Sequence, residues 1–105
     1  MEAEYDVIIL GGGAAGLSAG LYTGRAMMKT LILESIGSGG QLLITDEIEN
    51  YPGFTHGVKG QELAMIMDQQ TGRFGAEIEY AEVEGVDDLE KPVKVVHTYL
   101  SLIHI

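Results

Sequence analysis

The first third of the chain alternates between short apolar runs and segments rich in glycine. Val7–Leu10 is an apolar run too short to span a membrane, and three glycines follow it directly, as expected of a buried strand. Small and large residues then alternate through positions 17–22, which suits a helix packed on a sheet. A second apolar run, Thr30–Leu33, ends at Glu34. The pattern predicts a strand–helix–strand (βαβ) unit.

The rest of the chain predicts one helix and further strands. From Gly60 to Phe74 apolar residues recur at helical spacing, and Gly75 provides a stop. Ala76–Val83 alternates in the manner of a strand, and Val93–Tyr99 gives another strand beyond a polar turn, so we interpret this pair as a hairpin. The predicted fold is α/β: a partial Rossmann-like domain with a βαβ unit, a second helix, a third parallel strand and a β-hairpin.

The glycines between the first predicted strand and helix have a defined spacing. Gly11, Gly13 and Gly16 match G-x-G-x-x-G. In this motif the first glycine permits a tight turn, the second lets a pyrophosphate approach the backbone, and the third allows close helix–strand packing. The free N–H groups at the helix start then face the phosphates. With 15 glycines in 105 residues, a glycine-rich turn that binds nothing is the alternative; the flanking strand and helix favour a dinucleotide site.

Polar groups that could contact such a ligand follow the second predicted strand. Glu34 lies 18 residues after Gly16, where a carboxylate can accept hydrogen bonds from ribose hydroxyls and would repel a 2′-phosphate. This favours FAD or NAD. Gly39 and Gly40 would let the backbone pass close to the ligand, and Gln41 offers a donor and an acceptor, although a flexible linker explains this segment equally well.

Composition narrows the range of partners. The net charge is −10 and only six Lys and Arg residues are present, which argues against nucleic acid and anionic membranes as partners. The chain has no cysteine, and its three histidines are widely spaced, so we expect neither a metal site nor a redox dithiol in it. The acidic first residues and the lack of a long apolar segment lead us to expect a cytoplasmic protein.

Four motifs together suggest a family. They are VIILGGGAAG, GGQL at Gly39–Leu42, TDEIENYPGF at Thr45–Phe54 and RFGAEI at Arg73–Ile78. With them the chain resembles the N-terminal, FAD-binding part of bacterial thioredoxin reductases of the low-molecular-weight type. The resemblance implies that residues 1–99 form the N-terminal part of a Rossmann-like FAD-binding domain.

The resemblance also implies roles for individual residues. Gly12 to Ala15 would hold the FAD pyrophosphate, Glu34 to Gln41 would surround the ribose and phosphates, Asn50 would contact the cofactor, and Val83 would meet the adenine through its backbone. The cofactor-binding residues we expect are Gly11, Gly12, Gly13, Ala14, Ala15, Gly16, Glu34, Gly39, Gly40, Gln41, Leu42, Asn50 and Val83. No catalytic residue is expected, because the redox chemistry belongs to the cofactor.

The family implies electron flow from NADPH through FAD and a dithiol to thioredoxin, in a homodimer. The family's NADPH domain and Cys-x-x-Cys pair have no counterpart in this sequence, so we expect a piece of a longer enzyme that is inactive by itself. Two alternatives are a related flavoprotein, such as a ferredoxin reductase of the thioredoxin-reductase type or the flavin subunit of a peroxide-reducing system, and a non-catalytic nucleotide-binding module.

We interpret the last six residues as having a different origin from the rest of the chain. Leu100–Ile105, LSLIHI, looks like the conceptual translation of a transposase adapter used in sequencing libraries. We therefore expect a non-native tail, with an ordinary strand continuation as the alternative.

Overall fold

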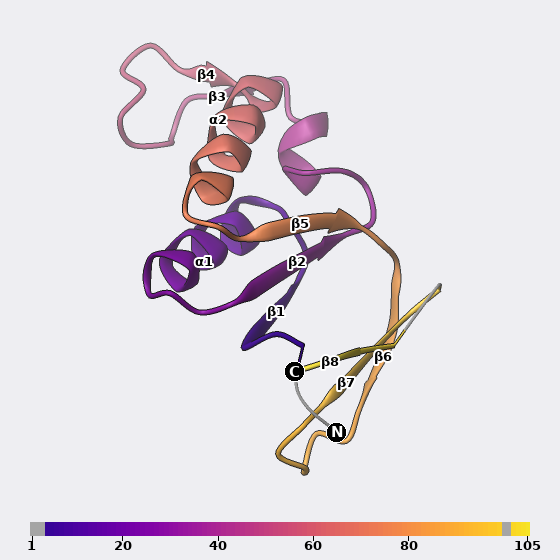
Figure 1. Ribbon diagram of the computed structural model, residues 1–105. Helices are drawn as coiled ribbons and strands as arrows, with labels where there is room; N and C mark the ends of the chain where they lie inside the picture. The colour runs from indigo at the N-terminus through magenta and orange to yellow at the C-terminus, as the bar shows by residue number, and fades with distance from the viewer. Residues whose placement is uncertain (1–3, 100–101) are drawn as a thin grey trace.

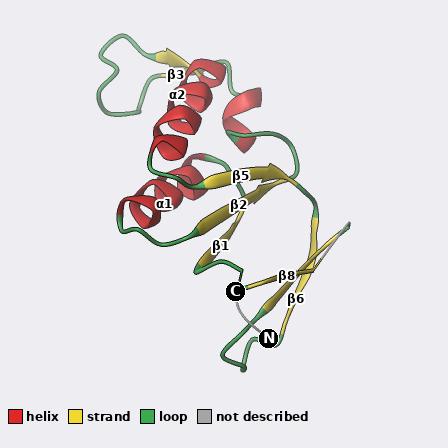
Figure 2. Ribbon diagram, viewed as in Figure 1, coloured by secondary structure: helices red, strands yellow, loops and turns green. Residues whose placement is uncertain are grey.

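The computed structural model describes residues 4–99 and 102–105 and is built in three layers (Figure 1). Two helices, α1 and α2, cover one face of a parallel sheet, and an antiparallel sheet lies on the other side (Figure 2). In chain order the elements are β1 (Val7–Leu10), α1 (Ala14–Arg25), β2 (Thr30–Glu34), the 3-10 helix η1 (Gly40–Ile44), β3 (Glu47–Ile48), β4 (Val58–Lys59), α2 (Gly60–Arg73), β5 (Glu77–Tyr80), β6 (Val83–Asp87), β7 (Val95–Thr98) and β8 (Leu102–His104).

Strand β2 lies at the centre of the parallel sheet, whose order is β1-β2-β5, and all five of its residues are buried. Ile32 belongs to the core cluster beneath the helices, together with Leu17 and Leu63. Leu31 and Leu33 alternate with it and belong to a second cluster with Val96 and Ile103 of the antiparallel sheet. Burial on both faces explains why the sequence of β2 is apolar without alternation, as in other parallel strands.

Helix α1 approaches its neighbours closely through a stripe of glycines spaced four residues apart. A Cβ atom added to Gly16 would lie 1.8 Å from the Gly11 carbonyl oxygen, and one added to Gly20 would lie 2.6 Å from Cδ1 of Ile32. One added to Gly24 would lie 2.9 Å from the Phe74 carbonyl oxygen. Residues at this spacing share one face of a helix, so α1 turns its smallest side toward the sheet and α2. Close packing therefore depends on glycine at Gly16 and Gly24, where the nearby atoms belong to the backbone, whereas the end of the Ile32 side chain could shift at Gly20.

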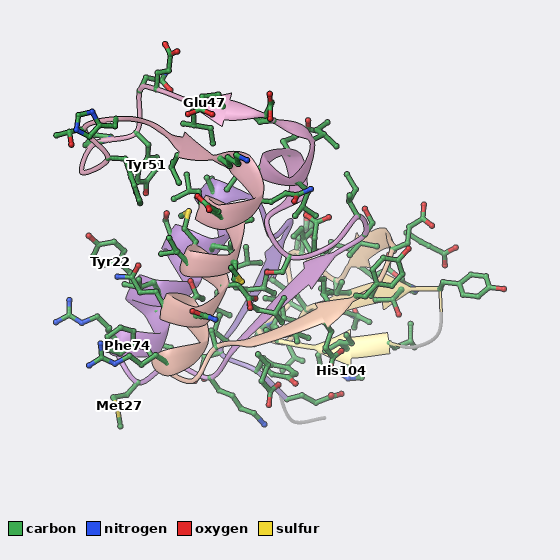
Figure 3. The ribbon with its side chains drawn as sticks, turned by 90° about the horizontal axis from the view of Figure 1, so that it is seen from above. Tyr22, Met27, Glu47, Tyr51, Phe74 and His104 are labelled. Carbon is green, nitrogen blue, oxygen red and sulfur yellow. The ribbon has the colours of Figure 1, made fainter. Side chains whose placement is uncertain are left out.

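Apolar and cationic side chains gather at one end of the helix pair. In Figure 3 Phe74 lies at the end of the pair opposite Tyr51, and the guanidinium groups of Arg25 and Arg73 lie 5.8 and 5.3 Å from the Phe74 ring centre. These are cation–π distances. Met27 nearby is 91% exposed.

Among the described residues, no helix is both long and apolar enough to cross a membrane.

The predicted βαβ unit and second helix are confirmed, but the pairing of the hairpin needs a correction. The Ala76–Val83 stretch contains β5, which pairs in parallel with β2 and so supplies the third parallel strand. The hairpin is formed instead by β6 and β7, which are antiparallel. The sequence pattern could not separate these strands, because β5 and the start of β6 are divided by only two residues, Ala81 and Glu82.

The end of the chain pairs with the hairpin. Leu102–His104 forms β8 antiparallel to β7, and Ile103 is buried. Positions 100 and 101 lie outside the described residues. The described part has the geometry of a strand continuation, and the non-native origin of the tail stays a prediction.

Candidate functional site

An open cleft of about 630 Å³ lies where β1 and β2 end and α1 begins. It brings together eight of the predicted residues: Gly11, Gly13, Ala14, Ala15, Gly16, Glu34, Gly40 and Gln41. Parallel strands of open α/β sheets place their ligand sites beyond their carboxyl ends, which is where this cleft lies.

The turn between β1 and α1 leaves backbone donors available in this cleft. Gly11 adopts a φ of 111°, which favours glycine, and its N–H donates to the Leu33 carbonyl at 2.8 Å. The first helical hydrogen bond runs from the Leu17 N–H to the Gly13 carbonyl at 2.9 Å. The N–H groups of residues 13–16 have no acceptor within the described part of the chain. Unpaired donors at a helix start, with the positive end of the helix dipole, favour an anion.

Glu34 is buried at the end of β2, and both of its carboxylate oxygens accept backbone hydrogen bonds. Oε1 accepts from the Gly12 N–H at 2.9 Å, and Oε2 accepts from the Ile36 N–H at 2.7 Å. Burial raises the pKa of this carboxyl, but the hydrogen bonds from backbone N–H groups, led by those of Ile36 and Gly12, outweigh burial and lower the pKa below its usual range. Each oxygen has a second lone pair, so the carboxylate can also accept from a ribose hydroxyl.

Two predicted glycines connect the turn to the loop after β2 and do not line the cleft. The Gly39 N–H donates to the Gly12 carbonyl at 2.8 Å, while the Gly12 N–H is used by Glu34. Both backbone hydrogen-bonding groups of Gly12, its N–H and its carbonyl, are therefore paired within the protein. The first N–H group of the turn without an acceptor in the described part of the chain is that of Gly13.

Val83 lies beside the cleft in a groove of about 280 Å³ that it shares with Ala81 and Glu82. Leu10, Gly11, Glu34 and Ser35 line both the groove and the cleft, so a single extended ligand can occupy the two. The remaining predicted residues do not line either space. Leu42 packs against the core, and Asn50 is exposed in the loop between β3 and β4.

The cleft also contains apolar residues that were not on the predicted list. Ile9, Leu10 and Ala19 contribute to its walls. Leu10 is 51% exposed although it belongs to an apolar strand run. Its position at the last residue of the strand, directly before the glycine turn, is the sequence signal that could have identified it.

The site combines a strand, a glycine turn with unpaired N–H groups, a helix, and a second strand that ends in a carboxylate. This arrangement is typical of dinucleotide-binding domains. The family model described as "Pyridine nucleotide-disulphide oxidoreductase" matches residues 5–100, and the chain belongs to this family.

Proteins named thioredoxin reductase are among its relatives. The chain is 53% identical over 83 residues to thioredoxin reductase of Treponema pallidum, covering 79% of this chain and 27% of that protein. The structure of Lactococcus lactis thioredoxin reductase matches with a TM-score of 0.89 and 42% identity, over 96% of this chain and 33% of that one. A ferredoxin-flavin thioredoxin reductase from Clostridium acetobutylicum matches with a TM-score of 0.79 and 25% identity, over 95% and 34%. The chain thus spans about a third or less of these proteins.

Proposed function

We propose that this chain binds the ADP half of FAD and supplies residues 1–99 as part of the FAD-binding domain of a thioredoxin-reductase-type enzyme. The observation that carries the proposal is the set of unpaired N–H groups at Gly13–Gly16, in a cleft that also contains the Glu34 carboxylate. These donors would hold the pyrophosphate, and Glu34 would accept from the ribose. The groove at Val83 would take the adenine.

The chemistry of the cleft fits FAD better than a 2′-phosphorylated nucleotide. A carboxylate with a lowered pKa remains charged at neutral pH, and it would repel a phosphate on the adenosine ribose. The name of one relative supports a flavin over NAD, since it is called a ferredoxin-flavin thioredoxin reductase.

In the complete enzyme, the bound flavin would carry reducing equivalents from NADPH to a dithiol and on to thioredoxin. This chain would bind and orient the cofactor without contributing a reacting side chain. We further propose that the complete enzyme is a homodimer in the cytoplasm, where NADPH is available.

Ligand competition tests the binding proposal. FAD added to the 105-residue chain should show a change in flavin fluorescence that ADP reverses, because ADP contains the adenine, ribose and pyrophosphate assigned to the cleft. FMN lacks the adenosine and should bind far more weakly than FAD. 2′,5′-ADP should compete poorly with FAD, because the Glu34 carboxylate would repel its 2′-phosphate. Equal binding of FMN and FAD would refute the assignment. Binding of NAD without FAD would favour the non-catalytic module.

A chimera tests the enzymatic function proposed for the complete protein. Residues 5–99 would replace the matching third of the Lactococcus lactis enzyme, whose backbone superposes well. We expect a chimera that retains flavin and reduces thioredoxin with NADPH. A folded chimera without flavin would contradict the proposal.

Reduced ferredoxin should be tested as a donor in the same assay, because the Clostridium acetobutylicum relative is named for it. Activity with ferredoxin and not with NADPH, in the complete protein that contains this chain, would favour a second candidate function, that of a ferredoxin-dependent reductase.

A further inference from the structure

The loop between β2 and η1 contacts the glycine turn between β1 and α1 at two points. The Gly39 N–H donates to the Gly12 carbonyl at 2.8 Å. The next residue, Gly40, lies so close to the turn that an added Cβ atom would be 3.2 Å from the Gly13 Cα atom. The position of this loop therefore sets the width of the cleft beside Gly13.

Helix α2 also holds this loop, through a side-chain hydrogen bond. The Ser38 hydroxyl donates to Oδ1 of Asp68 at 2.6 Å, and both residues are partly buried. The bond is short, as expected for a hydroxyl donating to a carboxylate, and such bonds are stronger than neutral ones. Within the described residues, Asp68 has no ion pair, so Ser38 is the partner that the structure gives its carboxylate.

A second contact lies one turn earlier on α2. Gly39 adopts a φ of 107°, and an added Cβ atom there would lie 2.4 Å from the Ala64 Cβ atom. Ala64 and Asp68 are four residues apart, so they lie on the same face of the helix. Steric contact at Ala64 limits how near the loop can come, and the hydrogen bond at Asp68 limits how far it can move away.

We propose that Ser38 and Asp68 are positioning residues for the cofactor site, which rests on the FAD-binding function proposed above. Neither residue lines the cleft. They act through Gly39 and Gly40: the hydrogen bond to α2 keeps the Gly39 N–H on the Gly12 carbonyl, and the turn keeps the shape in which the N–H groups of residues 13–16 stay open to a phosphate. Asp68 is a weak helix former at an interior helix position, and its contact with the loop explains its place there.

Amide hydrogen exchange in the ligand-free chain tests the positioning role without reference to FAD. Ser38→Ala and Asp68→Ala should each raise exchange at the Gly39 N–H by roughly tenfold or more, the change expected on losing a charge-assisted hydrogen bond. The double variant should exchange no faster than either single variant, because both substitutions remove the same bond. Ser38→Thr keeps the hydroxyl and should restore slow exchange. Gln69→Ala, at the exposed neighbouring position on α2, is the matched control and should leave exchange unchanged.

FAD affinity then tests the link to the cofactor. The dissociation constant for FAD should rise in Ser38→Ala and Asp68→Ala, and it should stay at the wild-type value in Ser38→Thr and Gln69→Ala. Unchanged Gly39 exchange in both alanine variants would overturn the positioning role. Faster exchange with unchanged FAD affinity would overturn its connection to the site. If the wild-type chain binds no FAD, the proposed function fails, while the exchange data still decide whether Ser38 and Asp68 hold the loop.

Discussion

Substitution of Gly16 by alanine should destabilise the protein although it improves helix propensity. The new methyl carbon would lie 1.8 Å from the Gly11 carbonyl oxygen and 2.9 Å from its carbon. These are backbone atoms, so the clash can be relieved only by moving the glycine turn or the helix. Overpacking costs about 1 to 3 kcal/mol of stability, and backbone clashes lie at the upper end of this range. The higher helix propensity of alanine offsets about 1 kcal/mol of the loss. We expect a net loss of about 2 kcal/mol.

Gly72 provides the matched control, since an alanine there has the same propensity effect without a clash. No atom lies within 4 Å of a Cβ atom added to Gly72 in α2. Gly72→Ala should stabilise the protein by up to about 1 kcal/mol. In urea unfolding the midpoint should fall by about 1 M for Gly16→Ala and rise slightly for Gly72→Ala, with similar slopes. Equal or higher stability of Gly16→Ala would refute the close packing of α1 on the turn.

Three further substitutions test the site and its support. Gly13→Val should abolish FAD binding and lower the unfolding free energy by only about 1 kcal/mol, the cost of a poorer N-cap residue, because the Gly39 carbonyl oxygen, 3.8 Å away, is the one described atom near its Cβ position. Glu34→Gln places an amide N–H against a backbone donor and should cost about 1.5 to 3 kcal/mol at pH 7. Because the pKa of Glu34 is lowered on folding, its stabilisation is present at neutral pH and is lost as the pH falls through that lowered value. The difference in urea stability between wild type and Glu34→Gln should therefore begin to shrink as the pH falls below the ordinary glutamate value of about 4.3, and a constant difference would contradict this. Thr71→Val removes the hydrogen bond from the Thr71 hydroxyl to the Leu17 carbonyl, 2.8 Å long, and should lower the unfolding free energy by about 1 kcal/mol, measured in urea.

The βαβ unit was predictable because its signals are local. The apolar run of β1, the glycines after it and the apolar run of β2 each occupy a few consecutive residues, and the structure places the strands within a residue of the prediction. Glu34 could be assigned to the cleft for the same reason, since the end of a strand beside a glycine turn is a defined place in this fold.

Contacts between distant residues could not be predicted. The role of Glu34 as acceptor for the Gly12 and Ile36 N–H groups depends on the path of the loop after β2, which no local pattern encodes. The bond between Ser38 and Asp68 joins residues 30 positions apart, and both side chains look like ordinary polar residues in the sequence. Strand β5 was merged with the hairpin because its partner, β2, lies more than 40 residues earlier in the chain.

The backbone amides of residues 13–16 offer the most direct test of the cofactor assignment. Titration of the ¹⁵N-labelled chain with FAD should shift the amide signals of Gly13, Ala14, Ala15 and Gly16 most strongly, because these N–H groups are open to the pyrophosphate. Gly72, whose Cβ position faces open space on α2, is the internal reference and should not move. Saturable shifts confined to the α1 start, the end of β2 at Glu34 and the groove at Val83 are the predicted result. FAD binding that leaves the amides of residues 13–16 unshifted would contradict the account.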